Sequence, residues 1–279
     1  MSYTVSFREV QSEPTIVVVG VGGTGSLVAD GVCRLFAKTE TKIMLIDYDR
    51  VEEHNLLRQN FYPGDVGKFK SQVIAERLAR FYGRPIGYSV FPYEKDLLNE
   101  NYGAGFIKQA INLIVLGCTD QAESRRHIAE SITWQNCWID AGNGYQSGQV
   151  LIGNTVEKDH LKESFSISEH RVIRLPAPSL QLPALLIPPA KPETPRDCAE
   201  AIDDNSQSPV INQAMATLML DVLWKLITDK LTYMGIYLDL EAGTLQYVPA
   251  TPMTIARMFS MKESELFQNK CALGARYHL

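Results

Sequence analysis

A set of charged and amide side chains follows a glycine-rich turn near the start of the chain. The turn spans residues 19–25 (VGVGGTG), and the side chains are those of Asp49, Asn55, Arg58, Gln59 and Lys70. Glycines let backbone amides approach phosphate oxygens closely, and the positive end of a following helix favours their negative charge. We therefore predict a nucleotide site at Gly20, Gly22, Gly23 and Gly25; a purely structural tight turn is the alternative.

Two further features narrow the kind of nucleotide site. The chain has no Gly-Lys-Ser or Gly-Lys-Thr, which argues against a mononucleotide P-loop. Asp47 lies 22 residues beyond Gly25, about where dinucleotide-binding folds place the acid that binds ribose hydroxyls. This acid does not separate NAD from ATP, and a solvated carboxylate at a strand end is the alternative.

The cations and amides after Asp47 are more selective. On a helical turn Asn55, Arg58 and Gln59 would share one face. The planar fork of a guanidinium suits phosphate oxygens, and Lys70 supplies a mobile point charge. Alone, Arg58 or Lys70 would be read as a solvated surface charge, but together these groups favour a polyphosphate over a nicotinamide ring.

The elements that must position these residues alternate between strand and helix. Apolar runs predict strands over 15–19, 42–47, 86–91 and 112–116, and helical spacing predicts helices over 26–38 and 70–82. This order predicts an α/β fold with a Rossmann-like, doubly wound and mostly parallel sheet.

The second half of the chain has a different character. A strand over 149–152 follows glycines at 142, 144 and 148, and seven prolines lie between residues 176 and 195. Prolines exclude an ordinary helix or central strand there, so we predict a long crossover loop, within 170–206. A core helix over 208–226 and a hairpin of 233–240 with 245–248 then predict an antiparallel C-terminal extension.

Five short motifs carry a resemblance to a known family. They are GVGGTG, DYDRVEEHNLLRQ, DVGKFK, CTDQAESR and DCAEA. The chain resembles the ThiF/MoeB and ubiquitin-activating-enzyme superfamily over residues 15–140 and more loosely over 196–227, and within it the ThiF-like proteins of PRTRC plasmid systems. The resemblance implies one adenylation domain over 1–279, with a nucleotide-binding half at 15–140 and a carrier-binding half at 141–279.

The resemblance also implies roles for individual residues. Asp47 would bind the ribose, Asn55, Arg58 and Lys70 the phosphates, and Gln59 would hold the arginine-bearing segment, with Asp49 among the nucleotide-binding side chains. Asp120 would bind the Mg²⁺ that bridges the polyphosphate. The register of the DVGxxK motif favours Lys70 over Lys68. Arg125 would support either the nucleotide site or a helix–helix contact, and we interpret Arg8 as a loose N-terminal charge rather than an arginine that acts in trans.

Cys198 of the DCAEA segment is a candidate acceptor of the activated carrier. A thiolate is a suitable nucleophile toward an acyl-adenylate, but Asp197 and Glu200 would oppose its formation, so a structural thiol is the alternative. The five cysteines, at 33, 118, 137, 198 and 271, form no C-x-x-C pair, and we expect neither disulfides nor the zinc found in relatives.

Composition limits the partners. A net charge of −5 with scattered cations argues against nucleic acid. No basic segment precedes an apolar stretch at the N-terminus, and no apolar run is expected to reach the length of a membrane span, which predicts a cytoplasmic protein.

The resemblance and the site chemistry together predict one activity. This is the ATP- and Mg²⁺-dependent adenylation of the C-terminal carboxylate of a small ubiquitin-like or sulfur-carrier protein, by a homodimer. The alternatives are a non-catalytic scaffold that binds a ubiquitin-like protein and an NAD-dependent oxidoreductase.

Overall fold

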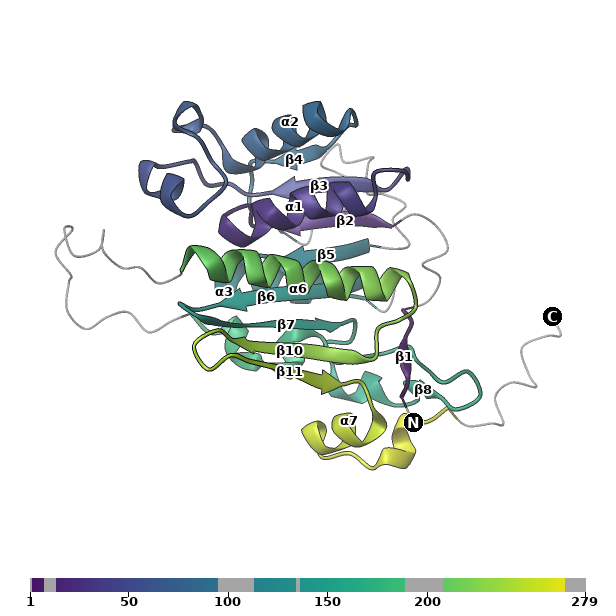
Figure 1. The fold of residues 1–279 in the computed structure, drawn as a ribbon. Helices are drawn as coiled ribbons and strands as arrows, with labels where there is room; N and C mark the ends of the chain where they lie inside the picture. Colours follow the sequence, from purple (N-terminus) through teal and green to yellow (C-terminus); the bar gives the residue numbers. More distant parts are fainter. Residues whose placement is uncertain (1, 8–13, 95–112, 134–135, 189–207, 269–279) are drawn as a thin grey trace.

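The computed structural model describes residues 2–7, 14–94, 113–133, 136–188 and 208–268. Within these residues a mixed eight-stranded sheet, in the order β11-β10-β7-β6-β5-β2-β3-β4, forms the centre of the molecule (Figure 1). Its strands are β2 (Thr15–Val19), β3 (Lys42–Ile46), β4 (Gly87–Ser89), β5 (Leu113–Gly117), β6 (Asn136–Asn143), β7 (Ser147–Gly153), β10 (Tyr233–Asp239) and β11 (Thr244–Pro249).

The strands from β4 to β6 form the parallel part of this sheet. β2 and β5 are buried along their whole length, as strands covered on both faces must be, and their valines, leucines and isoleucines suit that position. All four expected strands are present, with ends shifted by two residues or fewer. This confirms the Rossmann-like, mostly parallel sheet.

The antiparallel part begins at β6. This strand pairs in parallel with β5 and, on its other edge, antiparallel with β7, which continues to β10 and β11. The β10–β11 hairpin confirms the expected hairpin, and its turn contains Gly243 at φ +64°, a conformation that glycine adopts without strain.

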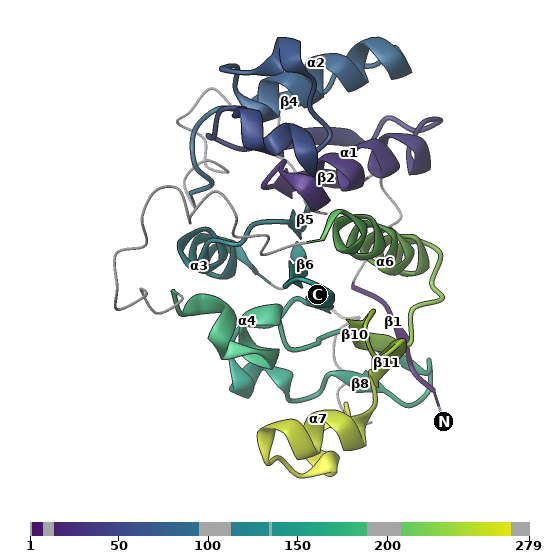
Figure 2. The same ribbon diagram turned by 60° about the vertical axis from the view of Figure 1, so that its left-hand side comes forward.

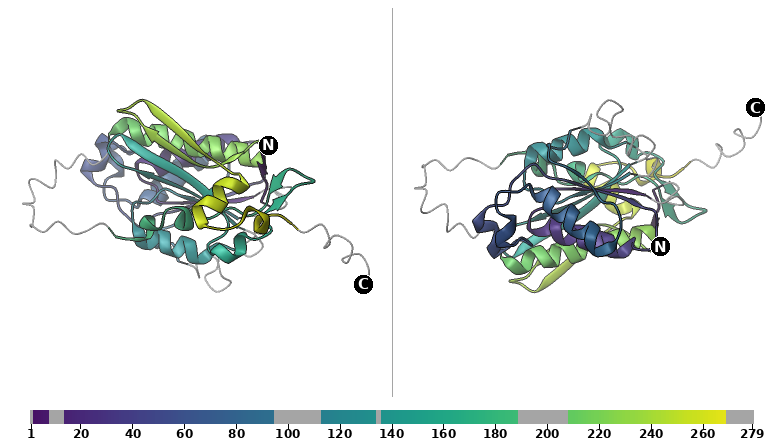
Figure 3. Two further views of the ribbon diagram at one scale, coloured as in Figure 1. Left: turned by 90° about the horizontal axis from the view of Figure 1, so that it is seen from below. Right: turned by 90° about the horizontal axis from the view of Figure 1, so that it is seen from above.

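Helices cover both faces of the sheet. They are α1 (Gly23–Leu35), α2 (Lys70–Tyr82), α3 (Ala122–Ser131), α4 (Pro178–Gln181), α6 (Pro209–Ile227) and α7 (Pro252–Phe259), with 3₁₀ segments η1 (Glu53–Leu57), η2 (Pro63–Asp65), η5 (Lys158–Leu161), η6 (Pro183–Leu186) and η7 (Glu263–Leu266). α1 packs against α2 and α6, whereas α3 packs with α4 and η6 on the opposite face (Figures 2 and 3). α1 begins and ends three residues before its expected limits.

The α6 helix corrects one expectation, because Val210–Ile227 is long and apolar enough to span a membrane. It begins at Ser208, whose side chain accepts a hydrogen bond from the Ile211 backbone, and Pro209 occupies its first turn. Its side chains at 211, 215, 219 and 222 are buried in the main core, and the helix packs along α1 and β6. These contacts are those of a core helix.

The expected crossover loop at 170–206 contains more regular structure than predicted. A small second sheet joins β1 (Thr4–Val5), β9 (Arg171–Val172) and β8 (Phe165–Ser166). Pro178 and Pro183 begin α4 and η6, positions where the missing N–H of proline has no helical partner to lose. The Pro-rich stretch thus contains short helical turns and no ordinary helix or central strand within residues 176–188, and 189–207 lie outside the described residues.

The start of α1 depends on close backbone contact, which yields a first prediction. A Cβ on Gly25 would overlap the backbone carbonyl of Gly20, which cannot rotate away as a side chain would. We expect Gly25→Ala to lower the free energy of unfolding by about 2–3 kcal/mol, measured by urea denaturation. Gly64→Ala is the matched control, because its Cβ would meet no atom within 4 Å; equal losses in the two variants would contradict this account.

Candidate functional site

A cavity of about 420 Å³ opens at the carboxyl ends of the parallel strands. It lies where the chain order in the sheet reverses, with β2 leading outward to β3 on one side and β5 leading to β6 on the other. Open α/β sheets place their ligands at such a point. The cavity wall includes most of the residues that the sequence assigned to the nucleotide and its metal: Gly20, Gly22, Gly23, Asp47, Asp49, Arg58, Gln59, Lys70 and Asp120.

The glycine turn forms the floor between β2 and α1. Gly20 has φ +85°, and a Cβ there would come within 2.7 Å of the Cys118 carbonyl oxygen, so this position requires glycine. Gly25 does not line the cavity, and its expected role in nucleotide binding stays a prediction. Its missing side chain instead lets α1 pack onto Gly20.

Asp47 ties the glycine turn to the end of β3. One carboxylate oxygen accepts from the Val21 backbone N–H at 2.6 Å and the other from the Asp49 N–H at 2.9 Å. Burial raises the pKa of Asp47, while these hydrogen bonds and the nearby Lys70 act to lower it. The carboxylate therefore shapes the turn and also presents oxygen lone pairs to the cavity.

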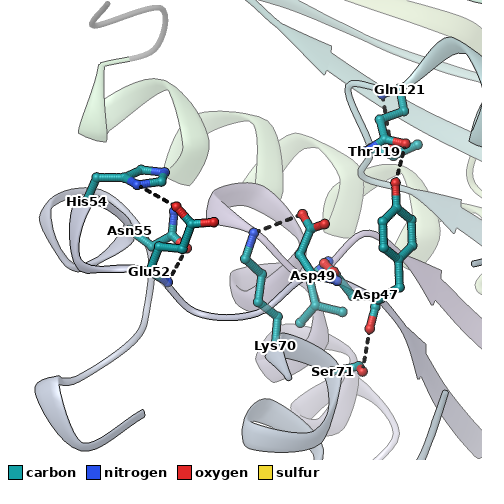
Figure 4. A network of polar contacts seen from close by, with 11 residues as sticks. Asp47, Asp49, Glu52, His54, Asn55, Lys70, Ser71, Thr119 and Gln121 are labelled. Carbon is teal, nitrogen blue, oxygen red and sulfur yellow. Dashed lines mark hydrogen bonds and ion pairs between the residues drawn. The ribbon is translucent and has the colours of Figure 1, made fainter. Parts of the chain in front are cut away.

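Lys70 lies at the first turn of α2 and points to Asp49 (Figure 4). Its Nζ is 3.1 Å from Asp49 Oδ2, and its side chain is 10% exposed whereas that of Asp49 is 46% exposed. An ammonium has three donors, so this ion pair fixes the amine and leaves donors for a ligand. Lys68 borders a separate surface hollow, so the cavity contains the lysine that the motif register favoured.

The 55–59 segment differs from its expected geometry. Only residues 53–57 form a helical turn, a 3₁₀ segment, and Arg58 and Gln59 follow it and line the cavity. Asn55 does not line it: the residue is 3% exposed and its Oδ1 accepts from the Glu52 backbone N–H at 3.0 Å (Figure 4). In this arrangement Asn55 shapes the loop, and its contact with phosphates stays a prediction.

The mouth of the cavity carries Asp120, just beyond β5. Asp120 is exposed, and beside it the Gln121 Oε1 accepts from the Tyr48 hydroxyl at 2.7 Å, which links the ends of β3 and β5 (Figure 4). Among the described residues no three His, Cys, Asp or Glu side chains gather as a metal cluster. One carboxylate beside a phosphate site still fits Mg²⁺, which takes one or two carboxylates and completes its shell with phosphate and water.

A buried ion pair that the sequence did not reveal lies at the cavity, where Arg125 is part of the wall and Asp140 is not. Arg125 on α3 and Asp140 on β6 are 8% and 1% exposed at their side chains, and Arg125 Nε lies 3.1 Å from Asp140 Oδ1. Arg125 also donates to the Ala141 carbonyl at 3.4 Å. Of the two roles considered for Arg125, helix–helix contact is replaced by this helix–strand pair, and the residue also lines the cavity.

Several neutral polar residues were also missed, among them three amide side chains from the second half of the chain. Asn143 at the end of β6, Gln149 on β7 and Asn212 on α6 all line the cavity. Asn212 is 1% exposed on an otherwise apolar helix face, and a polar residue at such a position is a signal that could have identified it. Asn143 and Gln149 could not be placed without knowing that β6 and β7 pair.

Two residues considered from the sequence cannot be placed. Cys198 and Arg8 lie outside the described residues. Of the described cysteines, Cys118 lines the cavity, and burial raises the pKa of its thiol, which opposes a nucleophilic thiolate.

The comparison with protein families gives one match over most of the chain. The model of the ThiF family matches residues 5–267. Among curated proteins, ubiquitin-like modifier-activating enzyme 5 of Drosophila persimilis is 30% identical over 139 residues, 47% of this chain and 35% of that protein. The Xenopus laevis protein of the same name is 30% identical over 136 residues, 46% of this chain and 33% of that protein. The matches thus span about a third of the length of these relatives.

Solved structures share the fold at low sequence identity. The Escherichia coli MccB structure with AMPCPP and MccA is 18% identical, covers 85% of this chain and 63% of its own, and has a TM-score of 0.51. The PaaA structure is 15% identical, covers 86% of this chain and 73% of its own, and has a TM-score of 0.56.

The Arg125–Asp140 pair yields a prediction with a pH dependence. Burial raises the pKa of Asp140, and Arg125 opposes this rise, so removing the arginine should raise the pKa further. A carboxyl whose folded pKa is raised is favourable to folding while protonated and loses that contribution as pH rises through the folded pKa. Arg125→Met should therefore lower the free energy of unfolding by about 3 kcal/mol or more at pH 8 and by less at pH 5.5, measured by urea denaturation.

The matched control removes both charges. Arg125→Met combined with Asp140→Asn leaves no buried ion, so its loss of stability should be smaller than that of Arg125→Met at pH 8 and should vary less with pH. A single variant whose loss is the same at both pH values would show that the ionised Asp140 is not the source of the cost.

Proposed function

The chain belongs to the ThiF family, and from this we propose that it is an ATP-dependent adenylyltransferase that activates the C-terminal carboxylate of a small ubiquitin-like or sulfur-carrier protein. At the level of the family, the match indicates an adenylyltransferase. The observation that carries the proposal is the convergence of Asp47, Arg58, Lys70 and Asp120 with the glycine turn on one cavity.

The similar proteins support this choice of chemistry. The curated relatives are named as activating enzymes for a ubiquitin-like modifier, and the MccB structures include ones with ATP or AMPCPP. Those ligands and substrates belong to the relatives, and their transfer to this chain is part of the proposal.

The proposed reaction joins two anions. The carboxylate oxygen attacks the α-phosphorus of ATP, a new P–O bond forms, and the bond to the β-phosphate breaks with its electron pair on pyrophosphate. Asp47 binds the ribose, while Arg58 and Lys70 neutralise charge that develops on the phosphates, a contribution that is large in a cavity where donors are already oriented. Bound Mg²⁺, held by Asp120, would supply further positive charge to the polyphosphate.

The later steps and the assembly belong to the same proposal. Cys198 would accept the acyl group if its thiolate attacks the acyl carbon and AMP departs, and transfer would otherwise proceed without an enzyme thioester. The enzyme is proposed to act as a homodimer on its carrier.

Two other functions use the same cavity. An NAD-dependent oxidoreductase needs the glycine turn and Asp47, but it gives no common purpose to Arg58, Lys70 and Asp120. A non-catalytic scaffold would bind a ubiquitin-like protein without turnover, and the polar cavity lining favours the enzyme over it.

Equilibrium binding distinguishes the oxidoreductase from the adenylyltransferase. We expect calorimetry to show Mg²⁺-dependent binding of ATP and no comparable binding of NAD, because the cavity wall presents cations and a carboxylate for a metal-bound triphosphate. Tighter binding of NAD than of ATP would reject the proposal. ATP–pyrophosphate exchange with candidate carriers then separates the enzyme from a scaffold, which would bind a carrier without exchange.

Lys70 should be needed for turnover but not for folding. We expect Lys70→Met to reduce the rate of ATP–pyrophosphate exchange about 100-fold or more, because one oriented charge donor to the reacting phosphate is lost. Lys68→Met is the matched control, since Lys68 lies outside the cavity and should leave the rate near that of the wild type. Unchanged exchange in Lys70→Met, with its fold checked by circular dichroism, would remove Lys70 from the mechanism.

A further inference from the structure

The side chain of Asn212 is held in one orientation inside the cavity wall. Its Oδ1 accepts from the Thr24 hydroxyl at 3.2 Å and from Asn143 Nδ2 at 3.1 Å. These partners come from α1 and from the end of β6, so three elements meet at this amide. Because two donors face Oδ1, the Nδ2 group must point away from them.

The Nδ2 group of Asn212 is buried and has no hydrogen-bond partner among the described residues. A buried donor without an acceptor is destabilising, so such a group calls for an explanation. Nδ2 lies over Gly23, where a Cβ would collide with it, and Gly23 also lines the cavity. The glycine thus makes room for this donor at the start of α1.

The two walls of the cavity differ in the kind of side chain that they carry. On the β3 side the polar side chains are mostly charged: the cations Arg58 and Lys70 lie beside the carboxylates Asp47 and Asp49. On the β6 side, Asn143, Gln149 and Asn212 are neutral, and the charge of Arg125 is compensated by Asp140. Neutral donors suit a group that is an anion at the start of the reaction and an uncharged acyl group at its end.

We propose that Asn212 Nδ2 donates a hydrogen bond to the carrier carboxylate, at the oxygen that does not attack and becomes the carbonyl oxygen of the acyl-adenylate. This rests on the proposed adenylation. One oxygen of the carboxylate forms the bond to the α-phosphorus as pyrophosphate leaves, and Asn212 holds the other, which keeps the attacking oxygen in line. Thr24 and Asn143 are positioning residues that fix the orientation of the amide.

The experiment uses two stable analogues that differ only in the acyl group. These are 5′-O-(N-glycylsulfamoyl)adenosine, which mimics an acyl-adenylate, and 5′-O-sulfamoyladenosine, which lacks the acyl oxygen. Wild-type protein should bind the glycyl compound more tightly in isothermal titration calorimetry. Asn212→Ala should lower the affinity for the glycyl compound about five- to tenfold and change the affinity for sulfamoyladenosine less than about twofold.

Two further variants keep the test decisive. Gln213→Ala removes an exposed amide from the same helical turn and should bind both compounds as the wild type does. Asn212→Asp keeps the oxygen that faces Thr24 and Asn143 but loses the amide donor, and it should show the same selective loss if Asn212→Ala does not fold.

The outcomes of these titrations distinguish a failure of the Asn212 assignment from a failure of the proposed adenylation. A selective loss for the glycyl compound supports the assignment of Asn212. Equal losses for both compounds, or no loss, overturn that assignment while leaving the adenylate site in place. A wild-type protein that binds neither compound overturns the proposed function and the assignment of Asn212 with it.

Discussion

The site depends on the two hydrogen bonds that the carboxylate of Asp47 accepts from backbone amides. This carboxylate binds the backbone of the glycine turn through Val21 and the backbone of the next loop through Asp49. Asp49 in turn pairs with Lys70 at the start of α2. One carboxylate therefore sets the relative positions of the turn and the lysine, and burial raises its pKa because this position excludes water.

The cavity lies between the parallel and the antiparallel part of the eight-stranded sheet. On the parallel side, strand ends and helix starts supply glycines and cations, and on the antiparallel side β6 and β7 supply amides. β6 joins them, because it pairs with β5 in parallel and with β7 in the opposite sense. Because β6 extends past Asp140 to Asn143, the amide of Asn143 lines the same cavity as the glycine turn.

Membership of the ThiF family and the arrangement of this cavity both support the proposed chemistry. The family match covers residues 5–267 and rests on sequence, whereas the low identity to MccB and PaaA makes their likeness one of fold alone. The residues proposed to bind the nucleotide lie within the short motifs that carry the family resemblance. The amide side chains proposed to face the acyl group, those of Asn143, Gln149 and Asn212, lie outside those motifs.

The sequence by itself determined the parallel strands, the glycine turn and the importance of the cations Arg58 and Lys70. These features depend on local patterns: apolar runs, glycine spacing and the register of short motifs. The predicted hairpin of β10 and β11 is present, and Lys70, which the motif register favoured over Lys68, lines the cavity. The sequence did not show that Asn55 and Gly25 lie outside the cavity wall, since a motif does not tell which of its side chains face the cavity and which support the loop behind it. Only the tertiary structure decided the Arg125–Asp140 pair and the contacts of Thr24, Asn143 and Asn212. Those contacts join residues up to 188 positions apart, and no local pattern specifies which distant helix packs against a strand end.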